Sequence, residues 1–279
     1  MQQLSSKLWV ETGQRGANHG VIDTGDGLVL IDGPQKPSDT VRLKAEIERI
    51  GTLKYILNTE PHGDHWTSNG FFDVPGVSHR SVRERMLETD MAAHVERVGT
   101  FGPDEASLLA GYEANAPVLT YETSMTFHVG NYTFRLINMP GHTPYPSAIL
   151  VEEEGVVFTS DNVFCGVQMW IQEGDPDAWQ QSLVDLRALS AETLVLGHGP
   201  VTDKRYLDER GSFTSEWVEY VRGAVDRGMT KAEAVASLTD MTARYPMGVE
   251  EDGMAPRVMR FNVANLYDYH TNEGIHATS

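Results

Sequence analysis

The sequence predicts an α/β protein in which two facing β-sheets are covered by helices on their outer sides. Two observations lead to this fold class. β-rich runs form two groups along the chain, and helical patterns lie between and after these groups. Each sheet needs another layer against its apolar face, so two β-rich halves with interspersed helices favour facing sheets with helices outside.

The first β-rich group begins with a hairpin and ends in a polar loop. A Thr-Gly-Asp-Gly turn at residues 24–27 separates two β-rich runs, which is typical of a hairpin. Apolar residues at positions 41, 43, 47 and 50 predict a helix that ends before Gly51. A His-rich loop, Thr59–Asn69, follows the last strand. The expected strands are Leu8–Thr12, His19–Asp23, Leu28–Asp32 and Lys54–Asn58, and the expected helices are Thr40–Ile50, Ser81–Val98 and Pro103–Tyr112.

The second β-rich group has its own hairpin, with a turn at Gly130-Asn131. Pro176 stands at the start of a later apolar-periodic run, a position that favours the beginning of a helix. The expected strands are Met125–Val129, Tyr132–Asn138, Ser147–Val151, Val156–Ser160 and Thr193–Leu196, and the expected helix is Asp175–Leu189.

The C-terminal part of the chain predicts helices from Asp203 to about His270, interrupted near Tyr245–Pro256. We therefore expect a sandwich domain over residues 1–205 and a helical C-terminal extension over residues 206–279 that packs on it. The amphipathic run Val258–Tyr269 favours burial on the chain's own core, and it leaves a homodimer open.

The composition excludes several classes of partner. Forty acidic residues against 22 basic ones give a formal net charge of −18, which repels nucleic acid and anionic membranes. No apolar run approaches the ~20 residues of a membrane span, and the N-terminus lacks the apolar region of a secretory signal. A single cysteine, Cys165, rules out an internal disulfide framework. We therefore expect a cytoplasmic protein with a small-molecule substrate.

Four polar clusters directly follow predicted strands, where loops project chemical groups from a rigid scaffold. The first reads Glu-Pro-His-Gly-Asp-His at residues 60–65, and each later cluster supplies one His or Asp. Imidazole nitrogens and carboxylate oxygens are ligands of Zn, Mn and Fe. One Gly-His pair alone is usually a surface turn, but the ordered series is specific. The candidate metal ligands are Glu60, His62, Asp64, His65, His142, Asp161 and His198.

The ordered series resembles the metallo-β-lactamase superfamily. Its signature is H-x-H-x-D-H, a later Gly-His, an Asp after a strand and a late Gly-His. The resemblance covers about residues 5–205 and implies a four-layer αβ/βα sandwich of two mixed sheets. The run Leu30-Ile31-Asp32-Gly33 resembles the family's first motif, which implies that Asp32 supports the metal loop by hydrogen bonding.

The resemblance also implies a dinuclear centre with two divalent metal ions. Metals about 3.5–4 Å apart would share a hydroxide that attacks an electrophilic carbon or phosphorus. Asp64 would also act catalytically by orienting this nucleophile. The implied ligands are Glu60, His62 and His142 for site one, Asp64, His65 and His198 for site two, and Asp161 as the bridge.

Glu60 is a departure, because it stands where the family signature has its first His. An added carboxylate makes the centre one charge unit less positive, so it favours Mn or Fe over Zn and stabilises ferric states. Flavodiiron proteins of the superfamily also carry a Glu in this motif, but at the second His. The alternative is that Glu60 binds no metal and site one is weak, as in mono-zinc β-lactamases that replace the same His.

Several aromatic and apolar residues near the clusters could have either a functional or a structural role. Trp66 could line a substrate pocket or pack in the core, and Phe164, Met169 and Trp170 form an apolar loop that could line the same pocket. Tyr145 could donate a hydrogen bond to a developing oxyanion, although loop packing is the more common role. Other His residues outside the signature, such as His79, favour structural roles.

Two functions follow from this ligand series. The favoured function is a metal-dependent hydrolase that acts on a small ester, lactone or amide through a metal-bridged hydroxide. The alternative is a diiron oxygen-binding or oxidoreductase protein on the same fold. A non-catalytic binding module is the weakest hypothesis, because every position of the series retains a ligating residue type.

Overall fold

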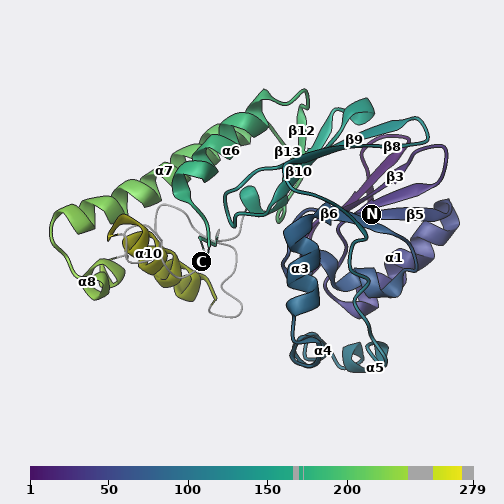
Figure 1. Cartoon of the computed structure of the whole chain (residues 1–279), viewed down its shortest axis with the longest axis horizontal. Helices are drawn as coiled ribbons and strands as arrows, with labels where there is room; N and C mark the ends of the chain where they lie inside the picture. The colour runs from purple at the N-terminus through teal and green to yellow at the C-terminus, as the bar shows by residue number, and fades with distance from the viewer. Residues whose placement is uncertain (166–169, 172, 238–253, 272–279) are drawn as a thin grey trace.

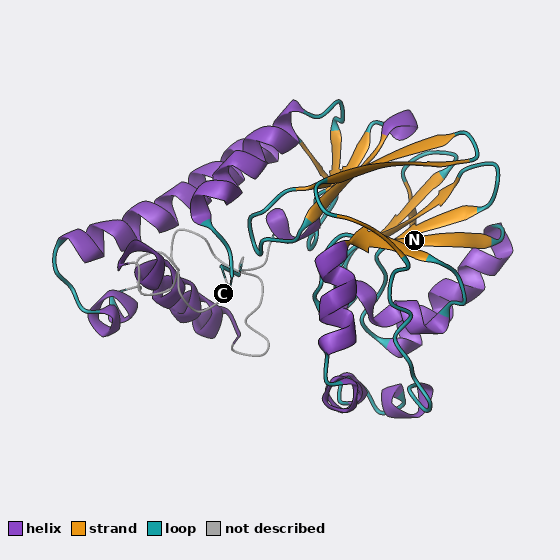
Figure 2. Ribbon diagram, in the orientation of Figure 1, coloured by secondary structure: helices purple, strands orange, loops and turns teal. Residues whose placement is uncertain are grey.

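The strands pair into two sheets, which confirms the predicted sandwich (Figure 2). The computed structural model describes residues 1–165, 170–171, 173–237 and 254–271. Strands of the first sheet follow chain order in space, and each pair from the fourth strand onward is parallel. These strands are β1 (Gln2–Gln3), β2 (Leu8–Glu11), β3 (His19–Asp23), β4 (Leu28–Ile31), β5 (Leu53–Asn58), β6 (Gly76–His79) and β7 (Leu119–Tyr121).

The second sheet is mostly antiparallel. Its strands, in spatial order, are β13 (Thr202–Asp203), β12 (Thr193–Val195), β11 (Val156–Phe158), β10 (Ser147–Val151), β9 (Tyr132–Asn138) and β8 (Ser124–Val129). Only β11 and β12 among these neighbours are parallel, and β10 is antiparallel to both β9 and β11. Strands β9, β11 and β12 therefore run in one direction and end at the same edge of the sheet.

Helices cover the outer side of each sheet (Figure 1). The first half of the chain contributes α1 (Pro37–Ile50), α2 (Gly63–Trp66), α3 (Arg80–Glu88), α4 (Met91–Gly99), α5 (Glu105–Leu108) and the 3-10 turn η1 (Thr67–Phe71). The second half contributes α6 (Pro176–Ala188), α7 (Arg205–Asp226), α8 (Lys231–Ala236), α10 (Met254–Thr271) and the 3-10 turns η2 (Glu152–Glu154) and η3 (Ser160–Asn162).

Period-two alternation along the strands explains the layers. In β4, Val29 and Ile31 pack between the sheets, whereas Leu28 and Leu30 pack against α1 on the outer side. In β10, Ile149 likewise faces the other sheet and its neighbours face the helices of the second half. Both faces of these strands are buried, so each reads as a continuous apolar run rather than as an alternating one.

The predicted helix Ser81–Val98 is wrong as a single element, because the chain breaks it into α3 and α4. Thr89 has an extended backbone, and the side chain of Asp90 accepts a hydrogen bond from the Ala93 N–H at 3.1 Å, which caps α4. The predicted helix Pro103–Tyr112 is reduced to the single turn of α5. The His-rich loop, in turn, contains the helical turns α2 and η1.

Among the C-terminal helices, α7 contacts α6 and β13, whereas α10 packs on α7 and α8 and extends beyond the second sheet (Figure 1). Residues of α7 and α10, such as Trp217 and Val263, share one buried cluster with Leu150 of β10 and Trp179 of α6. The helical stretch predicted after Asp203 has an additional break at Gly228, whose φ of +71° separates α7 from α8. Most of the predicted interruption, residues 245–253, lies outside the described residues. The division at residue 205 stays a prediction.

Within the parts of the chain that the structure describes, no helix has both the length and the hydropathy that a membrane span requires.

Candidate metal centre

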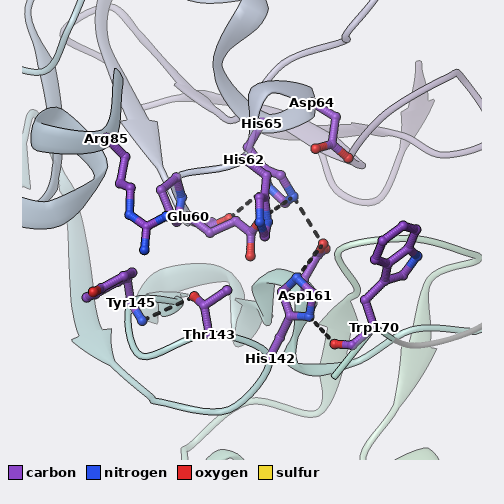
Figure 3. Close-up of polar contacts among 12 residues, drawn as sticks. Glu60, His62, Asp64, His65, Arg85, His142, Thr143, Tyr145, Asp161 and Trp170 are labelled. Atoms are coloured by element: carbon purple, nitrogen blue, oxygen red, sulfur yellow. Dashed lines mark hydrogen bonds and ion pairs between the residues drawn. The ribbon is translucent and has the colours of Figure 1, made fainter. Parts of the chain in front are cut away.

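The candidate ligands lie where both sheets end at one edge of the sandwich (Figure 3). The loop after β5 supplies residues 60–65, and the loops after β9, β11 and β12 supply the remaining ligands. Hydrogen bonds join these loops across the two sheets. The Ser147 N–H donates to the Thr59 carbonyl at 2.8 Å, and the Asn18 amide donates to the Leu196 carbonyl at 2.9 Å. The edge is therefore a fixed frame for groups from both halves of the chain.

Asp32 supports the first loop, as the family resemblance implies. Its Oδ1 accepts a hydrogen bond from the Thr59 N–H at 2.9 Å, and its Oδ2 accepts from the Thr59 hydroxyl at 2.6 Å. The same Oδ2 lies 3.0 Å from Nδ1 of His65. An imidazole that donates through Nδ1 presents an unprotonated Nε2, so Asp32 sets the tautomer that metal binding requires.

The first group of donors contains Glu60, His62, His142 and Asp161. One donor atom from each residue lies within 4.8 Å of the others. Glu60 is fully buried, and its Oε1 makes a short contact with Nδ1 of His62. The structure therefore brings Glu60 together with both imidazoles expected at site one.

The second group contains Asp64, His65 and His198, again with donor atoms within 4.8 Å of one another. Asp161 contacts both groups. Its Oδ1 lies 3.3 Å from Nε2 of His65 and 3.4 Å from Nε2 of His198, while its Oδ2 lies 4.0 Å from Nε2 of His142. One carboxylate thus points one oxygen at each group, which is the placement that a bridging ligand needs.

Glycines leave space for these ligands. A Cβ on Gly197 would lie 2.0 Å from Oδ1 of Asp161, and a Cβ on Gly141 would lie 2.3 Å from Oδ1 of Asn162. That Asn162 oxygen accepts a hydrogen bond from the His142 N–H at 3.0 Å. Glycine before each of the two late histidines is therefore a steric requirement of the site.

The electrostatic potential of the site favours cations. Burial alone would lower the pKa of His62, but the Glu60 carboxylate and its acidic neighbours outweigh burial and raise this pKa to about 9. Burial also opposes protonation of His198, yet Asp161 and Asp64 raise its pKa to about 10. A potential that draws protons to these two half-buried imidazoles also draws metal ions.

The donor atoms fit a metal centre. Three buried atoms that face the site make no hydrogen bond to the described residues: Oε2 of Glu60, and Nε2 of His65 and Oδ1 of Asp161, which contact each other only as an ion pair at 3.3 Å. Buried polar atoms are normally satisfied, and those that are not call for an explanation such as an ion. Nitrogen and oxygen donors at this density suit Zn, Mn or Fe.

The residues expected to line a pocket have different environments. The Trp66 side chain is only 1% exposed, stacks on His94 and donates from Nε1 to the Pro61 carbonyl at 2.7 Å, so it packs in the interior. Phe164 is buried and stacks on the imidazole of His198 with ring centroids 5.6 Å apart. Trp170 is partly exposed beside the first group (Figure 3). Met169 lies outside the described residues.

Tyr145 lies near the first group but directs its hydroxyl away from Glu60 and His142 (Figure 3). Its ring stacks on His79, and the guanidinium of Arg85 lies 5.3 Å from the ring centroid. Its role as an oxyanion donor therefore stays a prediction.

Arg85 is a cation beside the site that sequence reasoning missed. Its side chain is 41% exposed and forms an ion pair with Glu173 at 2.5 Å, which joins α3 to the loop before α6. No motif includes Arg85, and the helical pattern around it is that of an ordinary surface helix, so the sequence offered no signal for this position.

Comparison with known proteins identifies the family. Residues 12–198 match the model of the metallo-beta-lactamase superfamily. The lactamase-like protein aptB of Emericella nidulans is 27% identical over 197 residues, which cover 68% of this chain and 53% of aptB, so the chain spans about half the length of this relative. A hydroxyacylglutathione hydrolase of Methylococcus capsulatus is 29% identical over 156 residues, 55% of this chain and 50% of that protein.

Solved structures share the fold over almost the whole chain. A metallo-beta-lactamase family protein from Thermus thermophilus superposes with a TM-score of 0.70 at 19% identity, covering 98% of this chain and 95% of that one. The match therefore extends beyond the sandwich into the C-terminal helices. With a family model that spans more than half of its residues, the chain belongs to the metallo-beta-lactamase superfamily.

Proposed function

We propose that this protein is a dinuclear metal-dependent hydrolase that acts on a small ester, lactone or amide. The observation that carries this proposal is the carboxylate of Asp161, which faces both groups of donors with different oxygens. When bound there, divalent metal ions lower the pKa of water and polarise a scissile carbonyl. Six further donors from the two sheets would hold them: Glu60, His62, Asp64, His65, His142 and His198.

Asp64 is the residue we propose to orient the nucleophile. Its side chain is 24% exposed, so it lies on the open side of the site, and its Oδ2 is 3.3 Å from Nε2 of His198. Burial opposes ionisation, but hydrogen bonding and attraction from His198 and His65 hold the pKa of Asp64 below its ordinary value. Asp64 is therefore a charged acceptor at neutral pH.

The substrate that we propose is small and uncharged or apolar. Trp170 supplies apolar surface beside the donors, the buried Phe164 stacks behind His198, and the net charge of −18 disfavours nucleic acid. The similarity to a hydroxyacylglutathione hydrolase supports hydrolysis as the reaction class. The single Cys165, which can form no internal disulfide, supports the cytoplasm as the proposed compartment.

A diiron oxygen-binding protein is the second candidate function. The specific observation in its favour is the fully buried carboxylate of Glu60 among the donors of the first group. An anionic ligand in place of a neutral imidazole suits Mn or Fe and lowers the reduction potential of iron.

Metal analysis beside a substrate panel tests both candidates. The protein is produced without added Zn, purified in air and assayed for metal content, visible absorption and hydrolysis of esters, lactones and amides. We expect about two metal ions per chain and metal-dependent hydrolysis, which Asp161→Asn abolishes and the exposed control Asp185→Asn retains. A coloured iron protein without hydrolytic activity would favour the diiron function, and a metal-free protein would contradict both.

A further inference from the structure

We propose that α10, in the C-terminal extension, completes the metal centre by fixing the orientation of His142. Two asparagines of this helix, Asn262 and Asn265, hold the backbone of Ile171, and the preceding residue carries the carbonyl that bonds to His142. The inference rests on the proposed metal centre, and it assigns Asn262 and Asn265 as positioning residues.

The contact between α10 and Ile171 uses both backbone groups of that residue. The Ile171 N–H donates to Oδ1 of Asn262 at 2.8 Å, and Nδ2 of Asn265 donates to the Ile171 carbonyl at 2.7 Å. The two asparagines are three positions apart on a helix and so project from one face. More than ninety residues separate them from Ile171 in the chain, so this tertiary contact fixes a loop from a distant part of the sequence.

The adjacent peptide transmits this constraint to a candidate ligand. Nδ1 of His142 donates to the Trp170 carbonyl in a short hydrogen bond (Figure 3). Donation from Nδ1 leaves Nε2 unprotonated, and Nε2 is the atom that faces Oδ2 of Asp161 at 4.0 Å. The Trp170 carbonyl therefore fixes the tautomer of His142, as the Asp32 carboxylate fixes the tautomer of His65.

Packing alone does not explain two amides at this interface. Asn262 is fully buried and stands among apolar residues of α10, Met259, Val263 and Leu266, that belong to the shared core cluster. A buried amide is unfavourable unless it is hydrogen-bonded, and a leucine would fill the same space. The amides instead match the N–H and carbonyl of a single residue, which an apolar side chain could not recognise.

Isosteric variants test the assignment. Asn262→Asp keeps an oxygen that accepts from the Ile171 N–H, whereas Asn265→Asp loses the donor to the Ile171 carbonyl. Both add one negative charge, and a purely electrostatic effect would be larger at the fully buried Asn262 than at the half-buried Asn265. Tyr267→Phe is the control for helix packing, because it removes a 2.8 Å hydrogen bond between α10 and the Met229 carbonyl without touching Ile171.

The measurements are metal affinity, by competition with a chelator in the full chain, and the tautomer of His142 by ¹⁵N NMR. We expect Asn265→Asp to weaken binding of one metal equivalent about 10–100-fold and to reduce the Nδ1-protonated population, as loss of an outer-shell partner does. Asn262→Asp and Tyr267→Phe should stay within about threefold of the parent.

Equal affinities in the parent and Asn265→Asp, or equal losses in both Asp variants, would overturn the assignment while leaving the hydrolase proposal intact. A parent protein that binds no metal would overturn both proposals. If Asn265→Asp does not fold, Asn265→Gln is measured instead, because it retains a donor on a longer side chain. A parent-like His142 tautomer and metal affinity in this variant indicate an intact contact with Ile171. Losses in both indicate a broken contact.

Discussion

At the scale of a single residue, Glu60 changes the net charge of the proposed centre by one unit. It is buried beside His62 and His142, and its Oε2 has no hydrogen-bond partner among the described residues. We expect Glu60→Ala to reduce the metal content from about two ions per chain to about one. Glu60→His should keep two ions and shift the preference toward Zn, because the centre becomes one charge unit more positive.

Metal analysis by mass spectrometry measures both effects. The control is Glu192→Ala, since Glu192 is almost fully exposed and pairs only with Lys204 among the ion pairs of the described residues. The ligand assignment of Glu60 fails if the parent holds one ion and Glu60→His holds two.

His19 predicts a pH dependence of stability that is independent of metal. The imidazole is buried, and desolvation lowers its pKa to about 4 although a backbone hydrogen bond at Ala17 opposes the shift. The unfolded chain binds a proton below about pH 6.5 while the folded chain does not, so the free energy of unfolding decreases as the pH falls from 6.5 toward 4. At pH 5 this single group destabilises the fold by about 2 kcal/mol.

Urea unfolding of the chelated protein at pH 7 and pH 5 measures this contribution. In the parent, the free energy of unfolding should differ between the two pH values. His19→Gln should reduce this difference by about 2 kcal/mol, and the exposed control His128→Gln should leave it unchanged. An unchanged difference in His19→Gln would show that the imidazole of His19 is protonated within the fold.

The residues of the candidate site that the sequence identified are those that lie in short motifs after strands. His142 and His198 each stand between a glycine and a polar turn, and the structure explains those glycines by the space that neighbouring side chains occupy. Arg85 and Asn265 had no such signal. Arg85 lies beside the site and Asn265 bonds to Ile171, and only the tertiary packing of α3 and α10 places them there.

At the scale of an element, the turn after β12 is constrained by its contact with η3. A Cβ at Gly197 would lie 2.0 Å from Oδ1 of Asp161 and 2.8 Å from the Ser160 backbone. We expect Gly197→Ala to destabilise the fold by about 1–3 kcal/mol, because the backbone of a packed turn must shift, and to reduce metal content as Asp161 moves.

Gly211→Ala in α7 is the matched control, with the opposite sign. Its Cβ would meet only Oε1 of Gln180, at 3.9 Å, so alanine should stabilise the helix by about 0.5–1 kcal/mol. Urea unfolding measures both variants, and a Gly197→Ala protein as stable and metal-rich as the parent would contradict the steric explanation.

Element boundaries show why some predictions from pattern alone were wrong. The apolar period of Ser81–Val98 continues through the break between α3 and α4, so the break is visible only in the backbone of Thr89 and the cap by Asp90. Strand β7 is a three-residue edge with exposed Leu119, and a run so short and polar on one side gives little periodic signal. The fully buried strands β4 and β10 were predicted closely, because burial on both faces leaves continuous apolar runs.

For the whole molecule, the proposed centre joins two sheets that also meet through apolar packing and through hydrogen bonds between their loops. Residues 60–65 come from the first sheet, whereas His142, Asp161 and His198 come from the second. Metal binding to the folded chain should therefore stabilise the association of both halves. At a free metal concentration of 100 times Kd, each site should raise the free energy of unfolding by about 2.7 kcal/mol.

Urea unfolding after chelation and at increasing metal concentration measures this coupling. The unfolding midpoint of the parent should rise with metal concentration, whereas that of Asp161→Asn should rise much less because this variant lacks the carboxylate shared by both groups. Without metal the variant should not be more stable than the parent, because Asp161 then pairs with the imidazoles of His65 and His198. A midpoint that is independent of metal in the parent would mean that the two halves are not linked through this site, since a ligand that binds only the folded state must stabilise it.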